Sequence, residues 1–62
     1  MNLERLEQIR KDKGIPVTEL ANKLNINRST WYRWINGEMK PSFDKVIELC
    51  KILSIDISEI VN

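Results

Sequence analysis

The feature that most constrains the fold is a series of short apolar stripes with helical spacing, separated by glycine, proline and asparagine. Residues three and four apart lie on one face of an α-helix, so each stripe predicts a short amphipathic helix. The predicted helices have the approximate bounds 3–13, 17–24, 28–36, 43–53 and 57–61. No strand pattern competes with them, and the expected fold is therefore all-α, a compact arrangement of five helices in one domain, 1–62.

Residues with capping chemistry stand at the predicted helix ends. Ser and Asn side chains accept hydrogen bonds from first-turn amides. Such N-caps are expected at Asn2, Asn27 and Ser42. Asn25 is expected to end the second helix in the left-handed conformation. Asp56 and Glu59 have the spacing of a capping box before the last helix.

Composition excludes several classes of protein. One cysteine and no histidine among 62 residues leave no internal disulfide, and neither a metal site nor a cofactor is predicted. A thiol nucleophile at Cys50 would lack its usual base, so Cys50 is interpreted as a small buried hydrophobe and an enzyme is disfavoured. No long apolar run marks a membrane span, and a reducing cytoplasmic location is expected.

The predicted helix 28–36 has two unlike faces. Turning by about 100° per residue puts large apolar side chains, Trp31, Trp34 and Ile35, on one side. Polar or long side chains occupy the opposite arc, namely Arg28, Ser29, Tyr32, Arg33 and Asn36. Positive charge also peaks here, because Arg28, Arg33 and Lys40 are opposed only by Glu38. The apolar side is expected to fix the helix to the core and to present the other side outward.

An outward row of donors on a helix suits the major groove of DNA. Arginine donates two hydrogen bonds to guanine, and serine and tyrosine offer further contacts. The predicted base contacts are Arg28, Ser29, Arg33 and Tyr32, and the predicted phosphate contacts are Asn27, Thr30, Asn36 and Lys40. The main-chain amides at the start of the second helix offer another anion site. The alternative for each of these residues is an ordinary solvated surface side chain, and for Tyr32 this alternative has the same weight as a DNA contact.

Several stretches resemble the phage Cro and repressor type of helix-turn-helix domain. They are Leu20-Ala21, Leu24, the run from Asn27 to Gly37, and Pro41-Ser42. The resemblance implies a domain that binds double-stranded DNA and regulates transcription. A repressor is favoured because the chain has no room for an activation or ligand-sensing domain. The resemblance also implies base contacts at Arg28, Ser29 and Arg33.

The chain departs from that family at several positions. Pro16 and Val17 stand where Ser or Thr followed by Gln is frequent, and Asn25 and Ser54 replace expected glycines. Ile35 stands where a glutamate often pairs with an arginine at the position of Arg10, so Arg10 needs another partner. Carboxylates such as Glu4 and Glu7 are interpreted as solvated.

Two questions stay open from the sequence. The near-neutral net charge of +1 leaves a protein-interaction module as the alternative to a DNA-binding regulator. The residues Ile52, Ile57, Ile60 and Val61 form either the surface of a homodimer or the place where the last helix folds back.

Overall fold

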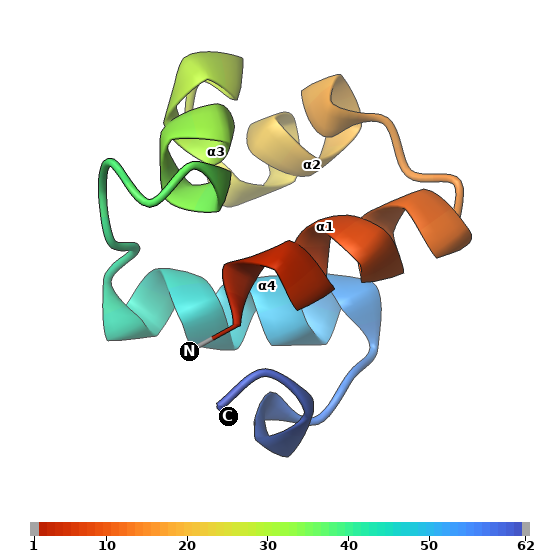
Figure 1. Ribbon diagram of the computed structural model, residues 1–62. Helices are drawn as coiled ribbons and strands as arrows, with labels where there is room; N and C mark the ends of the chain where they lie inside the picture. Colours follow the sequence, from red (N-terminus) through yellow and green to blue (C-terminus); the bar gives the residue numbers. More distant parts are fainter. Residues whose placement is uncertain (1, 62) are drawn as a thin grey trace.

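The computed structural model describes residues 2–61, and every regular element within that range is helical. Figure 1 shows the elements in chain order. They are α1 (Leu3–Asp12), α2 (Val17–Leu24), α3 (Arg28–Ile35), α4 (Phe43–Leu53) and the 3-10 turn η1 (Ile57–Glu59). The ends of the predicted domain, Met1 and Asn62, lie outside the described residues.

The prediction of a fifth α-helix over 57–61 is wrong. The structure has η1 there, a single 3-10 turn of three residues. Its capping box is confirmed, because Asp56 accepts a hydrogen bond from the Ser58 amide at 3.0 Å and Glu59 accepts one from the Asp56 amide at 3.2 Å. The turn ends because Ile60 leaves the helical conformation, with φ −122°, and enters the core. The bounds of the four α-helices agree with the predictions to within one residue.

Two of the three predicted N-caps are confirmed. The Asn2 side chain accepts a hydrogen bond from the Arg5 amide at 3.0 Å, and Ser42 accepts one from the Lys45 amide at 3.2 Å. The predicted side-chain cap at Asn27 is wrong, since that side chain accepts no hydrogen bond at the start of α3 from any residue in 2–61. The main-chain carbonyl of Asn27 instead accepts hydrogen bonds from the Thr30 and Trp31 amides, and the Asn27 side chain is exposed.

Left-handed residues end two of the helices. Asn25 adopts φ 58° after α2 and Ser54 adopts φ 55° after α4, the positions at which the family resemblance predicts glycine. Asparagine tolerates this conformation better than serine does. The predicted C-cap at Asn25 is confirmed, and the greater backbone strain is at Ser54.

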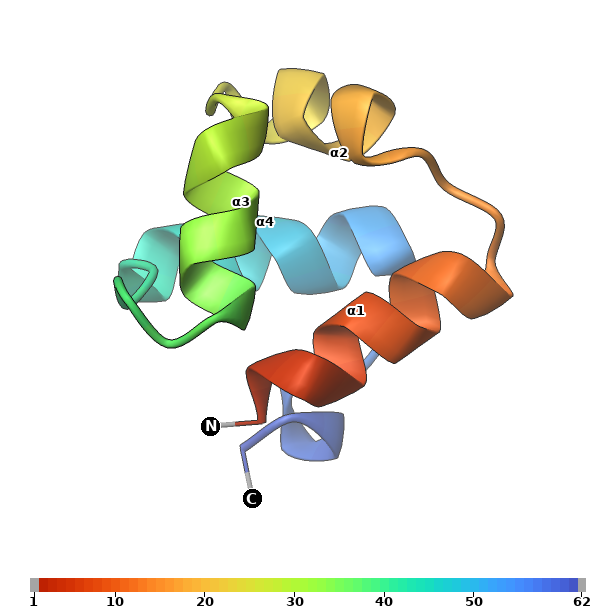
Figure 2. The ribbon, with the colours of Figure 1, turned by 45° about the horizontal axis from the view of Figure 1, so that its top comes forward.

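The helices enclose a core dominated by aliphatic side chains and two tryptophans. α2 packs against both α3 and α4, α1 packs against α3, and η1 packs against α4 (Figure 2). The indole rings of Trp31 and Trp34 meet edge to face at 6.2 Å between centroids, and Trp31 is only 1% exposed. Aromatic rings bury about 150–250 Å² each, so these two supply a large part of the apolar area that holds α3 in place.

The last described turn folds back onto the first. The Asn2 amide donates a hydrogen bond of 2.7 Å to the Ile60 carbonyl, and the Ile60 side chain is fully buried. Ile60 is therefore unable to contribute to a dimer surface, which corrects that part of the prediction. None of the described helices is long and apolar enough to cross a membrane.

Candidate nucleic-acid interface

α3 presents its polar side chains to solvent. The exposed residues on and next to it are Asn27, Arg28, Ser29, Tyr32, Arg33 and Asn36. Thr30 and Ile35 are half-buried, and Trp31 and Trp34 are buried. The burial pattern agrees with the helical spacing, because the tryptophan side chains fix the rotation of α3 about its axis. The structure thus brings all four predicted base-contacting side chains to one accessible face.

The cations on the exposed face of α3 and in the loop after it have no ion-pair partners among residues 2–61. Other basic side chains do: Lys23 lies 3.8 Å from Glu19, and Arg5 lies 4.0 Å from Glu59. Arg28, Arg33 and Lys40 make no such contact within the described part of the chain. Their charges are therefore not neutralised by neighbouring carboxylates, which is the condition for binding a polyanion.

A tight turn after α3 leads the chain to Lys40. Gly37 takes φ +77°, a conformation that glycine adopts without steric cost. The Gly37 amide donates to the Trp34 carbonyl at 3.2 Å, and the Glu38 amide donates to the Arg33 carbonyl at 2.9 Å. These bonds satisfy the last carbonyls of α3 and direct the chain back past the helix end.

A groove between α2 and α3 adds residues that the sequence analysis missed. It has a volume of about 260 Å³ and is lined by Thr18, Ala21, Asn22, Ile26, Asn27 and Arg28. Thr18 and Asn22 are exposed and stand one turn apart on α2. That spacing of four was the available signal, because it puts two short polar side chains on the α2 face next to α3. Pro16, the N-cap of α2, offers no side-chain hydrogen bond to the first turn of the helix.

A largely buried polar contact supports α3 from α1. The Glu7 carboxylate accepts a 2.5 Å bond from Arg10 Nε and a 3.3 Å bond from Trp31 Nε1. Arg10 also donates to the Ile15 carbonyl at 2.7 Å. The Glu7 and Arg10 side chains are only 17% and 12% exposed, so the interpretation of Glu7 as a solvated carboxylate is wrong. Glu7 takes the place of the glutamate that the family resemblance puts at Ile35.

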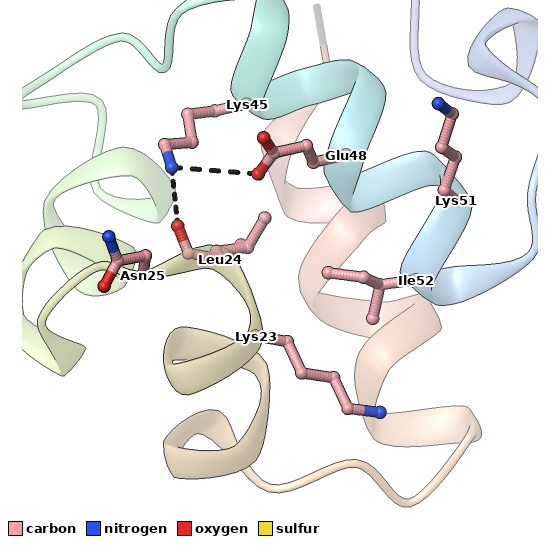
Figure 3. A pocket seen from close by; sticks show the side chains of 7 residues that line it. All are labelled: Lys23, Leu24, Asn25, Lys45, Glu48, Lys51 and Ile52. Carbon is pink, nitrogen blue, oxygen red and sulfur yellow. Dashed lines mark hydrogen bonds and ion pairs between the residues drawn. The ribbon is translucent and has the colours of Figure 1, made fainter.

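A lysine connects α4 to the end of α2. Lys45 Nζ donates a hydrogen bond of 2.6 Å to the Leu24 carbonyl and lies 3.7 Å from Glu48 Oε2, and Figure 3 marks both interactions. An ammonium group at a helix C-terminus satisfies a carbonyl that has no partner within the helix. The surrounding depression of about 460 Å³ is lined by Lys23, Leu24, Asn25, Lys45, Glu48, Lys51 and Ile52. None of the predicted DNA contacts lines it.

Cys50 has the environment of a core residue. The side chain is buried, and burial raises the pKa of its thiol, with smaller contributions from the charges of Asp56 and Glu59. A thiol that resists ionisation is a poor nucleophile. Within residues 2–61, no three His, Cys, Asp or Glu side chains gather where they would hold a metal ion.

α2 and α3 have the geometry of a helix-turn-helix, joined by three residues and with the polar face of α3 exposed. The turn is formed by the left-handed Asn25 and by a 2.9 Å hydrogen bond from the Ile26 amide to the Ala21 carbonyl. The family model of the Cro/C1-type helix-turn-helix DNA-binding domain matches residues 5–62. The chain belongs to this family. α2 and α3 are the two helices of this motif, and the exposed row from Arg28 to Asn36 lies on the second of them.

A solved structure has the same Cro/C1-type fold. The crystal structure of a transcriptional regulator from Listeria innocua superposes with a TM-score of 0.83 at 30% sequence identity. The match covers 95% of this chain and 55% of that one, so the chain spans about half the length of its structural neighbour. A comparison with curated proteins finds no match.

Proposed function

We propose that this domain recognises a specific sequence of double-stranded DNA, with α3 in the major groove, and represses transcription by occupying that site. The observation that carries the proposal is the orientation of α3. Trp31 and Trp34 are buried beneath it, while the guanidinium groups of Arg28 and Arg33 are exposed and have no ion-pair partner among residues 2–61. Membership of a DNA-binding family and a transcriptional regulator as structural neighbour support it. The domain would act in the cytoplasm.

The proposed base contacts lie along the outer face of α3. Arg28 and Arg33 each donate two hydrogen bonds to the O6 and N7 atoms of a guanine, which discriminates against other bases by about 1–3 kcal/mol per arginine. Ser29 donates to or accepts from a base edge, and Tyr32 contacts a thymine methyl group or a phosphate.

The proposed phosphate contacts surround that row. Asn27 and Thr30 lie at the start of α3, and Asn36 and Lys40 follow its end. Contacts to both ends of a helix fix how far it enters the groove without reading sequence. The groove between α2 and α3 offers two more donors of this kind, Thr18 and Asn22.

Selection of bound sequences from random duplexes tests the base assignments. Arg28→Ala and Arg33→Ala are each expected to abolish the preference at one base position, at a cost of about 1–3 kcal/mol on the preferred site. Arg5→Ala is the matched control, because Arg5 is exposed but lies on α1 beside Glu59. Unchanged selected sequences for both α3 variants refute the assignment.

A salt titration separates phosphate contacts from base contacts. Lys40→Ala is expected to weaken binding to all sequences alike and to reduce the slope of log K against log salt by about one unit. Lys51→Ala is the control, since Lys51 lines the depression between α2 and α4. An unchanged slope for Lys40→Ala removes that residue from the phosphate contacts.

The repressor is proposed to bind as a homodimer. Two copies related by a two-fold axis present their α3 helices to major grooves one DNA turn apart, about 34–36 Å. The operator is then a palindrome, and an operator without two-fold symmetry contradicts the dimer. Of the four residues predicted for the dimer surface, Ile60 is excluded by its burial, Ile52 and Ile57 are half-buried, and Val61 is exposed.

A further inference from the structure

An asparagine stands directly before a glycine at the end of α3. Asn36 is the one asparagine of the chain that precedes glycine, and the pair lies in the turn through which α3 leads to α4 (Figures 1 and 2). Asparagine is a thermolabile residue. It is most labile before glycine, because no Cβ shields the following main-chain nitrogen. The pair Asn36–Gly37 is therefore a place where the main chain can modify its own side chain.

The reaction available to this pair is deamidation through a cyclic imide. The Gly37 nitrogen attacks Cγ of Asn36, forms a new N–C bond and gives up its proton, while the side-chain nitrogen leaves as ammonia. Water then opens the five-membered imide at either of its two carbonyls. One opening gives aspartate. The other gives isoaspartate, in which the main chain continues through the former side chain.

The folded turn holds the reacting atoms apart. At ψ −2° of Asn36 the Gly37 nitrogen eclipses the main-chain nitrogen of Asn36, whereas ring closure requires it on the side of Cβ. The Gly37 amide also donates to the Trp34 carbonyl at 3.2 Å, and the Glu38 amide donates to the Arg33 carbonyl at 2.9 Å. These two bonds form the Schellman motif that ends α3, with Gly37 at φ +77°. The turn therefore has to open before the imide forms.

Opening this turn disturbs far less of the structure than unfolding the domain. Asn36, Gly37 and Glu38 are exposed, and the two bonds of the Schellman motif close the turn. Helix ends open locally while the core stays folded. Two hydrogen bonds of ordinary net strength lower the open population about 5- to 150-fold. Deamidation is therefore expected in the folded protein, slower by that factor than in the unfolded chain.

The product alters the face of α3 that is proposed to bind DNA. Three basic residues and one acidic residue give the segment 28–40 a net charge of +2, and a carboxylate at position 36 halves it. The new carboxylate stands three residues after Arg33, a spacing at which ion pairs form on a helix, so it competes with DNA for that guanidinium. It also replaces a proposed phosphate contact, and like charges repel.

We infer that Asn36–Gly37 is a deamidation site, and that opening of the turn after α3 sets the rate at which a copy of the protein irreversibly loses DNA binding. The chemistry depends on the chain alone. Only its consequence rests on the proposed function.

Peptide mapping by mass spectrometry tests the site. The tryptic peptide 34–45 contains Asn36 as its one asparagine, and the peptide 24–28 contains Asn25 and Asn27, which are exposed and precede residues other than glycine. In the full chain, unfolded in urea at mildly alkaline pH, peptide 34–45 is expected to acquire the mass of the acid well before peptide 24–28 changes. No change in 34–45, or equal rates in the two peptides, overturns the inference.

Comparison of native buffer with urea tests control by the turn. The rate in native buffer is expected to be about 5- to 150-fold below the rate in unfolding urea. Urea below the unfolding transition is expected to leave the native rate within about twofold, because local opening exposes little surface. Equal rates in native buffer and in unfolding urea, or a native rate that rises with the unfolded fraction, overturns control by the turn.

Two variants test the consequence for DNA binding. Incubated wild type and Asn36→Asp are each expected to bind the selected duplex at least about tenfold more weakly than fresh wild type. Asn36→Gln is the matched control, because its longer carboxamide forms no five-membered ring, and it is expected to keep its own starting affinity over the same incubation. Circular dichroism establishes that each protein retains its helices.

A saturating duplex distinguishes this inference from the proposed function. Bound copies hold the turn closed, so the duplex is expected to slow modification of peptide 34–45 at least about tenfold. An unchanged rate with duplex, or undiminished binding by incubated wild type and Asn36→Asp, overturns the link between modification and DNA binding. Failure of fresh wild type to bind any duplex overturns the proposed function, while peptide mapping still decides the modification.

Discussion

Replacing Glu7 by alanine removes the acceptor on which a buried indole depends. Trp31 is 1% exposed, and its Nε1 donates to the Glu7 carboxylate at 3.3 Å. In Glu7→Ala this N–H has no acceptor, and a buried unsatisfied donor costs about 1–3 kcal/mol. Arg10 also loses its carboxylate, but it keeps the Ile15 carbonyl at 2.7 Å. We therefore expect Glu7→Ala to lower the free energy of unfolding by about 2–3 kcal/mol.

That loss is large for this domain. A chain of 62 residues is expected to have a free energy of unfolding of about 3–9 kcal/mol. A change of 2 kcal/mol corresponds to a fall in Tm of about 8–16 °C at this size. Thermal and urea unfolding followed by tryptophan fluorescence and circular dichroism measure it. Glu7→Gln keeps an oxygen acceptor and is expected to lose about half as much.

Two controls isolate the indole bond. Glu4→Ala changes an exposed carboxylate on the same helix and is expected to stay within about 0.5 kcal/mol of the wild type. In a Trp31→Phe background the donor is absent, so Glu7→Ala is expected to cost at least about 1 kcal/mol less than it does in the wild type. An equal cost in both backgrounds refutes the reasoning.

Three further predictions follow from local geometry. Ser54→Gly is expected to raise the free energy of unfolding by about 0.5–1 kcal/mol in urea titrations, because it relieves the backbone strain of a serine in the left-handed conformation. Asn25→Gly is expected to change the free energy of unfolding by less, and the reverse order contradicts the strain argument. The Ser58 amide donates a hydrogen bond to the Asp56 carboxylate and lowers its pKa, so the ionised carboxylate stabilises the fold above the ordinary Asp pKa and this stabilisation is lost as pH falls through the lower folded value. Asp56→Asn is expected to flatten the dependence of the free energy of unfolding on pH below about 4, and an unchanged profile contradicts this. Lys45→Met leaves the carbonyl at the end of α2 without its donor and is expected to cost about 1 kcal/mol in thermal unfolding, while Lys51→Met changes little; equal effects would show that the Lys45 bond is not stabilising.

The helices and most of their ends were predictable because their determinants are local. The apolar stripes of α1 to α4 follow the helical repeat, and the caps at Asn2 and Ser42 act within one turn. The left-handed Asn25 and the capping box at Asp56 are equally short-range. Such features require no knowledge of which helix packs on which.

The two unlike faces of α3 were also predictable from the sequence. The spacing within α3 separates the tryptophans from the arginines, and burial in the structure agrees with it. The groove that adds Thr18 and Asn22 required the relative placement of α2 and α3. Which bases and phosphates these side chains contact stays a prediction, since contact depends on a duplex as well as on the fold.

The chain by itself determined where helices form and which face of each is apolar, because a helix is stabilised by hydrogen bonds four residues apart. Tertiary structure alone decided the pairing of Glu7 with Trp31, which are 24 residues apart in the chain, and the burial of Ile60 against the start of α1. It also left Phe43 exposed at the start of α4. These outcomes depend on how helices of fixed pattern stack, and the free energy that selects one stacking is shared among residues far apart in the sequence.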